Sequence, residues 1–198
     1  MIPELNQQVE ALSALLESRS LIDPQVDADY RKAVTEQWTH RNGALLCARA
    51  WVDPGFKGQL MRDGREAAAS MGFAMPPHHA RLVVKENTEH LHNVVCCTLC
   101  SCSPFTIIGI VPSWYKNLEY RARIVREARS TLAELGLHLP DDMQVRVWDT
   151  TTDTRYMVLP MRPTGTAGWS EERLAELVTQ DALIGAARPG WPSAATGS

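Results

Sequence analysis

The sequence lacks a strong charge of either sign. Its formal net charge at pH 7 is −3, and its basic residues are scattered along the chain. Nucleic-acid-binding proteins usually carry a concentrated basic patch, so this balance gives no reason to expect a nucleic-acid partner. One modest basic cluster has helical spacing and indicates a solvated or partner-facing side of a helix. It consists of Arg121, Arg123, Arg126 and Arg129.

The start of the chain lacks the basic segment and apolar run of a secretory signal. We therefore expect a cytoplasmic protein, in whose reducing environment disulfide bonds are rare. Residues 93–115 carry no charged side chain and are long enough to raise the question of a membrane span. Because Pro104, Pro112 and several hydroxyl side chains interrupt this stretch, we interpret it as buried chain and expect no membrane partner.

Cysteine is scarce but concentrated. The sequence has five cysteines, and four of them fall within the seven residues from Cys96 to Cys102. Cys97, Cys100 and Cys102 form a C-x-x-C-x-C motif, whose thiolates can converge on one soft or borderline metal ion. Ser101 lies between two of these positions, so its backbone nitrogen is a candidate ligand as well.

Other cysteine-based sites fit the pattern less well. A structural zinc site usually joins two separated C-x-x-C or C-x-x-H knuckles, and the sequence has no second knuckle. An iron–sulfur cluster usually requires a fourth, distant cysteine. Cys47 is the remaining cysteine, and its apolar helical surroundings are typical of a buried small hydrophobic residue. On the motif alone, structural zinc is the main alternative.

The first part of the chain has helical periodicity, and strand-like segments follow it. The sequence predicts an α+β protein with a helical N-terminal arm over residues 1–75, a layered α/β domain that contains the candidate metal-binding cysteines over 76–188 and a flexible tail over 189–198. Ser113 is expected to cap a long helix that ends at Gly136. Residues 145–149 and 155–159 are expected to pair as strands joined by residues 150–154.

The segment from His92 to Cys102 closely resembles the metal claw of the nitrile hydratase alpha subunit. Further segments match the same family, and together they extend over about residues 25–188. They are Arg41–Ala44, Ala50–Pro54, Pro112–Lys116, Tyr120–Arg123, Arg155–Pro160 and Gly165–Ser170. The chain thus resembles a cobalt-type alpha subunit, and the gamma subunit of thiocyanate hydrolase is a close relative of that family.

The resemblance implies that Cys97, Cys100 and Cys102 bind one low-spin trivalent metal ion, together with the backbone nitrogens of Ser101 and Cys102. Thr98 follows the first cysteine as in the cobalt type, which implies Co(III), with Fe(III) as the lesser alternative. In the family, two of the claw cysteines are oxidised. By position, the resemblance implies a sulfinic acid at Cys100 and a sulfenic acid at Cys102. These two would be the catalytic cysteines, and either the sulfenate or metal-bound hydroxide would be the nucleophile.

The implied activity is hydration of a nitrile to the amide, for which the metal polarises the nitrile or lowers the pKa of bound water. Two alternatives stay open: thiocyanate hydrolysis by a gamma-type subunit, and a non-catalytic metal-binding interaction subunit. The family implies a beta subunit, or two chains that replace it. It also implies an activator protein that loads cobalt.

Residues beyond the ligands are weaker candidates. Many cobalt-type relatives have Tyr-Pro-Trp after the claw, whereas this chain has Ser103-Pro104-Phe105. We expect the smaller Ser103 and Phe105 to enlarge the substrate pocket for a bulky heteroaromatic nitrile, such as a nucleoside nitrile of the toyocamycin kind. Trp114 is a third pocket candidate. Glu86 and Arg155 are candidates to support the ligands from outside the coordination sphere.

Overall fold

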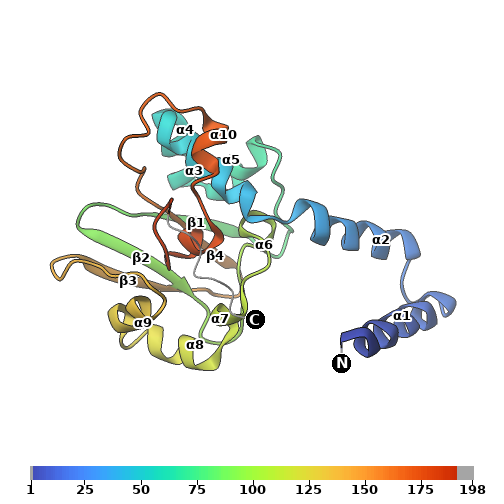
Figure 1. Cartoon of the computed structure of the whole chain (residues 1–198). Helices are drawn as coiled ribbons and strands as arrows, with labels where there is room; N and C mark the ends of the chain where they lie inside the picture. The colour runs from blue at the N-terminus through green and yellow to red at the C-terminus, as the bar shows by residue number, and fades with distance from the viewer. Residues whose placement is uncertain (1, 191–198) are drawn as a thin grey trace. The chain divides into compact units, whose positions relative to one another are not determined.

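The computed structural model describes residues 2–190 of the chain (Figure 1). Contacts within the chain divide it into two compact units, residues 1–37 and 38–198. The boundary expected after residue 75 lies inside the second unit, because helices between residues 40 and 70 bury Leu46, Leu60 and Ala67 in its core. The expected tail, 189–198, falls almost entirely outside the described residues.

The described part of the first unit is helical. Asp23 caps its second helix by accepting a hydrogen bond from the backbone N–H of Gln25 at 2.8 Å. On the first helix, Leu5, Val9 and Leu12 are exposed along one apolar stripe. The helices are α1 (Ile2–Ser18), α2 (Pro24–Lys32) and the π-helix η1 (Ala33–Gln37).

The second unit begins with three helices in close succession: α3 (His40–Val52), α4 (Pro54–Arg62) and α5 (Gly64–Ser70). Asp53 caps α4 and Asp63 caps α5, each by accepting a hydrogen bond of 3.0 Å from a backbone N–H three residues on. These two caps divide the segment into three short helices. The α3 helix packs against α4, and both α4 and α5 pack against strand β1 (Arg81–Glu86).

Four strands form two parallel two-stranded sheets (Figure 1). In one sheet β1 (Arg81–Glu86) pairs with β4 (Thr154–Leu159), and in the other β2 (Leu91–Cys96) pairs with β3 (Gln144–Asp149). The expected pairing of β3 with β4 is wrong. Their partners lie far away in sequence, so the alternation within each segment predicts a strand but not its neighbour. Residues 150–153 instead carry the chain from one sheet to the other.

The segment after β2 forms four short helices: α6 (Phe105–Ile108), α7 (Ser113–Lys116), α8 (Leu118–Ile124) and α9 (Ala128–Glu134). The expected long helix from Ser113 to Gly136 is wrong. Asn117 has an extended backbone, and its side chain accepts a 2.7 Å hydrogen bond from the N–H of Glu119, so it ends α7 and caps α8. Pro112 is the N-cap residue of α7, and no side chain caps that helix.

Two further helices, α10 (Glu171–Ala175) and α11 (Gln180–Ile184), complete the second unit. The α10 helix packs against α3, while α11 packs against β2 and β4. Asn93 connects the sheets, because its side-chain N–H groups donate to the carbonyl oxygen of Glu86 at 2.8 Å and to Asn87 at 3.1 Å. Its side-chain oxygen accepts from the indole N–H of Trp148 at 2.8 Å. No helix within residues 2–190 is long and apolar enough to cross a membrane.

Candidate metal centre

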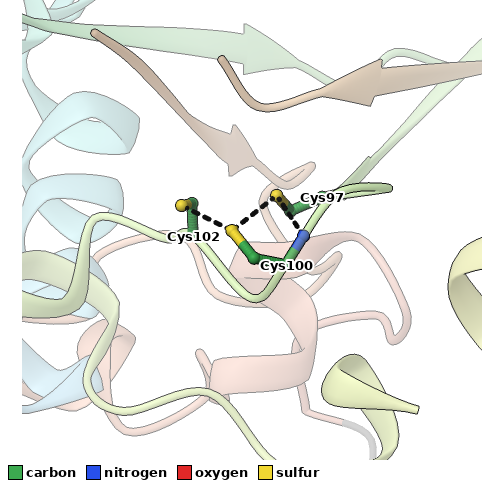
Figure 2. A group of neighbouring side chains, drawn as sticks. All are labelled: Cys97, Cys100 and Cys102. Atoms are coloured by element: carbon green, nitrogen blue, oxygen red, sulfur yellow. Dashed lines mark hydrogen bonds between the residues drawn. The ribbon is translucent and has the colours of Figure 1, made fainter. Parts of the chain in front are cut away.

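The residues that follow β2, 97–102, form the claw loop, in which three cysteine side chains point toward one another (Figure 2). The Cys100 Sγ atom lies 3.4 Å from the Cys97 Sγ atom and 2.8 Å from the Cys102 Sγ atom. All three sulfur atoms lie within 4.8 Å of one another. Three thiols from one short loop therefore form a donor set that suits a soft or borderline metal ion.

The other two cysteines lie outside this cluster. Cys96 is fully buried, and burial raises the pKa of its thiol to about 12. Cys47 is also fully buried, where its thiol donates to the carbonyl oxygen of Val158 at 3.9 Å and desolvation raises its pKa. Ser101 lies in the loop between two of the clustered cysteines and is half-buried.

The clustered thiols do not share one pKa. A hydrogen bond from the Cys102 thiol lowers the pKa of Cys100, which is exposed to solvent. Burial raises the pKa of Cys102 to about 12, and its hydrogen bond to Cys100 acts in the same direction. Of Cys100 and Cys102, Cys100 therefore loses its proton more readily. Since a metal binds thiolates rather than thiols, metal binding must release the protons of this cluster.

Three side chains outside the loop hold its backbone. The Asp149 carboxylate accepts hydrogen bonds from the Thr98 N–H at 2.9 Å and from the Thr98 hydroxyl at 2.5 Å. The Arg121 guanidinium donates to the Cys100 carbonyl oxygen at 2.9 Å. The Tyr115 hydroxyl donates to the Cys102 carbonyl oxygen at 3.1 Å. Sequence reasoning missed the contact of Asp149 with the loop, whereas Arg121 belonged both to the basic cluster and to the family-like segment Tyr120–Arg123.

A cavity of about 360 Å³ adjoins the claw loop. Cys100, Ser101 and Cys102 line it together with Ser103 and Phe105, so the structure places two of the three predicted pocket residues beside the thiols. Arg155 also lines this cavity.

Trp114 and Glu86 are not among the described residues that line the claw cavity. Trp114 packs edge-on against Tyr120, with ring centroids 4.9 Å apart, and lines a separate cavity of about 120 Å³. Glu86 forms an ion pair with Lys57 and lines another cavity with Trp51. These two predictions therefore receive no support from the arrangement of the cavity.

One wall of the cavity is aromatic. The Phe105 ring lies 4.6 Å from the Trp38 ring and 4.7 Å from the His79 ring, measured between centroids. Burial, together with the positive charge of Arg155, lowers the pKa of His79 to about 4, so the imidazole is neutral at pH 7. No pattern in the sequence predicted that His79 would be buried beside the claw.

Arg155 is buried, and its guanidinium donates to the carbonyl oxygens of Thr151 and Thr152. Its Nε atom has no hydrogen-bond partner within the described residues. Its positive charge lowers the pKa of both Cys102 and His79. The positive charge of Arg155 thus favours the thiolate of Cys102, against the larger opposing effect of burial, and its role in supporting the ligands stays a prediction.

The fold and this loop define an α+β protein with a three-thiol metal-binding site. The family described as "Nitrile hydratase, alpha chain" matches residues 3–187. The low-molecular weight cobalt-containing nitrile hydratase subunit alpha of Rhodococcus rhodochrous is 45% identical, over 97% of this chain and 92% of that relative. The thiocyanate hydrolase subunit gamma of Thiobacillus thioparus is 44% identical, over 79% of this chain and 70% of that relative.

A solved structure agrees with these sequence matches. It is a double mutant of the Fe-type nitrile hydratase from Comamonas testosteroni Ni1, with 54% identity and a TM-score of 0.89 over 99% of this chain and 95% of that chain. The chain therefore belongs to the nitrile hydratase alpha-chain family. This confirms the family, the α+β fold class and the enzyme class that the sequence predicted.

Proposed function

We propose that this chain is the metal-binding catalytic subunit of a nitrile hydratase, which hydrates a nitrile to the corresponding amide. The observation that carries the proposal is the convergence of the Cys97, Cys100 and Cys102 sulfur atoms within 4.8 Å beside a cavity of about 360 Å³. The proposed ligands are these three sulfurs and the backbone nitrogens of Ser101 and Cys102. Cys100 is proposed to be a sulfinic acid and Cys102 a sulfenic acid.

The chain's own residues prepare the site for this reaction. When bound, the metal supplies a Lewis acid that polarises a nitrile or lowers the pKa of water. Ser103 and Phe105 line the cavity next to the claw loop and would orient the substrate. The contact of Phe105 with Trp38 and His79 forms an apolar wall that limits access of water from that side. The guanidinium of Arg155 offers positive charge beside Cys102.

The metal is proposed to be Co(III), which the 45% identical cobalt-containing relative supports. Fe(III) is a second candidate, because the 54% identical structure is of the Fe type. Metal analysis and intact mass, measured on protein from cells supplied with both metals, would decide between them. About one cobalt per chain and about three added oxygen atoms are expected, since a sulfinic acid adds two and a sulfenic acid one. Zinc without added oxygen, even after cobalt is supplied in air, would contradict the proposal.

The proposed partners are a nitrile hydratase beta subunit, or two chains that replace it, and an activator protein that loads cobalt. The exposure of the claw loop supports a covering partner: Leu99 is 89% exposed and Cys100 is exposed as well. An apolar side chain on such a loop is usually buried when a partner binds. We propose a cytoplasmic location for the assembly. Co-purification of a second chain with a tagged form of this chain would test the partnership.

The proposed substrate is a bulky heteroaromatic nitrile. Ser103 and Phe105 line the cavity, and Phe105 belongs to an aromatic wall against which a flat ring system can stack. Turnover of acrylonitrile should be compared with turnover of a pyrrolopyrimidine nucleoside nitrile. The nucleoside nitrile is expected to have the higher kcat/KM, and a strong preference for acrylonitrile would contradict the assignment.

Thiocyanate is the second candidate substrate. Lys116 and Arg155 line the claw cavity, whose described lining contains no acidic residue, and this charge suits an anion. The 44% identity to a thiocyanate hydrolase gamma subunit supports it as well. The products distinguish the reactions, since a nitrile gives an amide whereas thiocyanate gives carbonyl sulfide and ammonia. A metal with no exchangeable position would favour a non-catalytic binding subunit instead.

A further inference from the structure

We propose that Asp149 and Arg121 are positioning residues that hold the claw loop in its metal-binding shape before metal arrives. Asp149 acts through Thr98, and Arg121 acts through the carbonyl group of Cys100. Neither side chain belongs to the proposed ligand set. The inference rests on the proposed metal site, and it assigns to residues of β3 and α8 a role in metal affinity.

The position of Asp149 follows from the pairing of the strands. The last residues of β2 and β3, Cys96 and Asp149, are direct partners in the parallel ladder, and the Thr150 N–H donates to the Cys96 carbonyl oxygen at 2.9 Å. The claw loop leaves β2 at this point and brings Thr98 next to the end of β3. Both carboxylate oxygens of Asp149 are used, one by the Thr98 N–H at 2.9 Å and the other by its hydroxyl at 2.5 Å.

These two hydrogen bonds fix the first turn of the loop. A carboxylate that accepts them makes stronger bonds than a neutral acceptor does. Thr98 directly follows the ligand Cys97, so the two contacts restrict the backbone next to the first sulfur. The hydroxyl is essential for one of them, which distinguishes Thr98 and serine from every aliphatic side chain of similar size.

Arg121 holds the other side of the loop. Its Nη1 atom donates to the Cys100 carbonyl oxygen at 2.9 Å and lies 3.5 Å from the Thr98 carbonyl oxygen. One guanidinium thus reaches the carbonyl groups on both sides of the exposed Leu99. Arg121 belongs to α8 and Asp149 to β3, so two separate elements make hydrogen bonds to the same loop.

The loop needs such support because it has no regular secondary structure of its own. A flexible loop loses conformational entropy when its sulfur atoms converge on a metal, whereas a loop already held in place loses less. In metal sites generally, substitution of residues that orient the ligands lowers metal affinity about 10- to 100-fold. We expect an effect of that size from the loss of either positioning residue.

The first test compares Thr98→Val with Thr98→Ser in the full chain assembled with its partner subunit. Metal-free protein is titrated with cobalt(II) chloride against a competing chelator, and the sulfur-to-cobalt charge-transfer bands are recorded. Thr98→Val is expected to weaken cobalt binding about tenfold or more and to shift these bands. Thr98→Ser keeps the hydroxyl and is expected to bind within about twofold of the unaltered chain. Asp149→Ala should reproduce the effect of Thr98→Val.

The second test compares Arg121→Met with Arg129→Met. Arg129 is a matched control, because its guanidinium also binds backbone carbonyl groups but does so away from the claw, at Leu139, Pro140 and Met143. Arg121→Met is expected to weaken cobalt binding about tenfold or more, whereas Arg129→Met should leave the affinity unchanged. Circular dichroism of each metal-free variant confirms that the titrated protein is folded.

The outcomes separate this inference from the proposed function. If the unaltered chain binds neither cobalt nor iron at the claw, both the metal site and the positioning role are wrong. If it binds metal, and Thr98→Val and Arg121→Met bind it as tightly as Thr98→Ser and Arg129→Met, the positioning role is overturned while the metal site stands. The inference is supported if Thr98→Val and Arg121→Met bind metal more weakly while Thr98→Ser and Arg129→Met bind it as the unaltered chain does.

Discussion

The Cys100 and Cys102 sulfur atoms lie 2.8 Å apart, yet the pKa values of their thiols shift in opposite directions. A hydrogen bond from Cys102 lowers the pKa of Cys100, whereas burial raises that of Cys102 to about 12. The more exposed of the two thiols is thus the one that loses its proton first as the pH rises. Because the thiolate is the nucleophile, this places the more reactive sulfur of the pair at the surface of the claw loop.

Thiol reactivity of the metal-free chain should follow exposure and pKa together. We expect iodoacetamide at pH 8 to alkylate Cys100 first, because it is exposed and its thiolate is favoured. Cys47 and Cys96 are fully buried with raised pKa values, so they should react only after unfolding. Peptide mass spectrometry over a time course measures the order. Alkylation of Cys96 in folded protein as fast as that of Cys100 would contradict the structure.

Two glycines test how closely α11 packs on β2. Gly185 and Gly136 both have φ near +91°, but a Cβ at Gly185 would lie 2.1 Å from the Asn93 carbonyl oxygen, while none of the described atoms lies within 4 Å of one at Gly136. We expect Gly136→Ala to lower the free energy of unfolding by about 1 kcal/mol through backbone strain alone. Gly185→Ala should cost about 3 kcal/mol or more. Urea denaturation compares them, and equal losses would refute the close approach.

The buried amide of Asn93 should be essential for joining the two sheets. Asn93→Leu leaves the indole N–H of Trp148 and the carbonyl oxygen of Glu86 without their partner, so we expect a loss of about 2 to 4 kcal/mol of unfolding free energy. Trp148→Phe removes one of these hydrogen bonds and should cost about 1 kcal/mol. Chemical denaturation of both variants provides the test. A leucine variant as stable as the phenylalanine variant would mean that the amide network contributes little.

The buried His79 should make stability depend on pH. Its pKa is lowered from 6.5 to about 4 in the folded chain, so between these values the unfolded state binds more protons than the folded state. The free energy of unfolding therefore falls as pH drops below about 6.5 and should lose about 1 to 2 kcal/mol between pH 7 and pH 5 from this residue. His79→Gln removes the titrating group and should reduce that loss. Urea denaturation of both proteins at pH 7 and pH 5 measures this difference. If His79→Gln loses as much unfolding free energy as the unaltered chain, His79 is not the source of the pH dependence.

Short-range features were predictable from the sequence. The C-x-x-C-x-C spacing alone brings three sulfur atoms together, because so few residues separate Cys97 from Cys102. Asp23 and Asp53 each precede a proline, and both cap helices as such pairs usually do. The strands expected at residues 145–149 and 155–159 match β3 and β4 to within one residue, since period-two alternation is a local property.

The predictions that were wrong, and the contact that was missed, concern features that depend on residues far apart in the sequence or on competition for one backbone group. Strand partners are chosen by contacts such as that of Trp148 with Asn93, which no single segment encodes. The helix after Ser113 breaks where the Asn117 side chain competes for a backbone N–H, a choice that propensity decides only weakly. Asp149 and Thr98 are distant in sequence, and their contact appears only when β2 and β3 pair.

The parallel pairing of β2 with β3 has a consequence for the order of events during synthesis. Asp149 is made 53 residues after its ladder partner Cys96, and at ordinary translation rates of about 5 to 20 residues per second this takes about 3 to 10 s. During that interval α8 with Arg121 is made before β3, so the claw thiols exist on the nascent chain without the carboxylate of Asp149 until the end. A metal ion that binds early therefore encounters a loop that Asp149 does not yet hold. A metal ion that binds after β3 has emerged encounters a loop whose Thr98 is already hydrogen-bonded to Asp149.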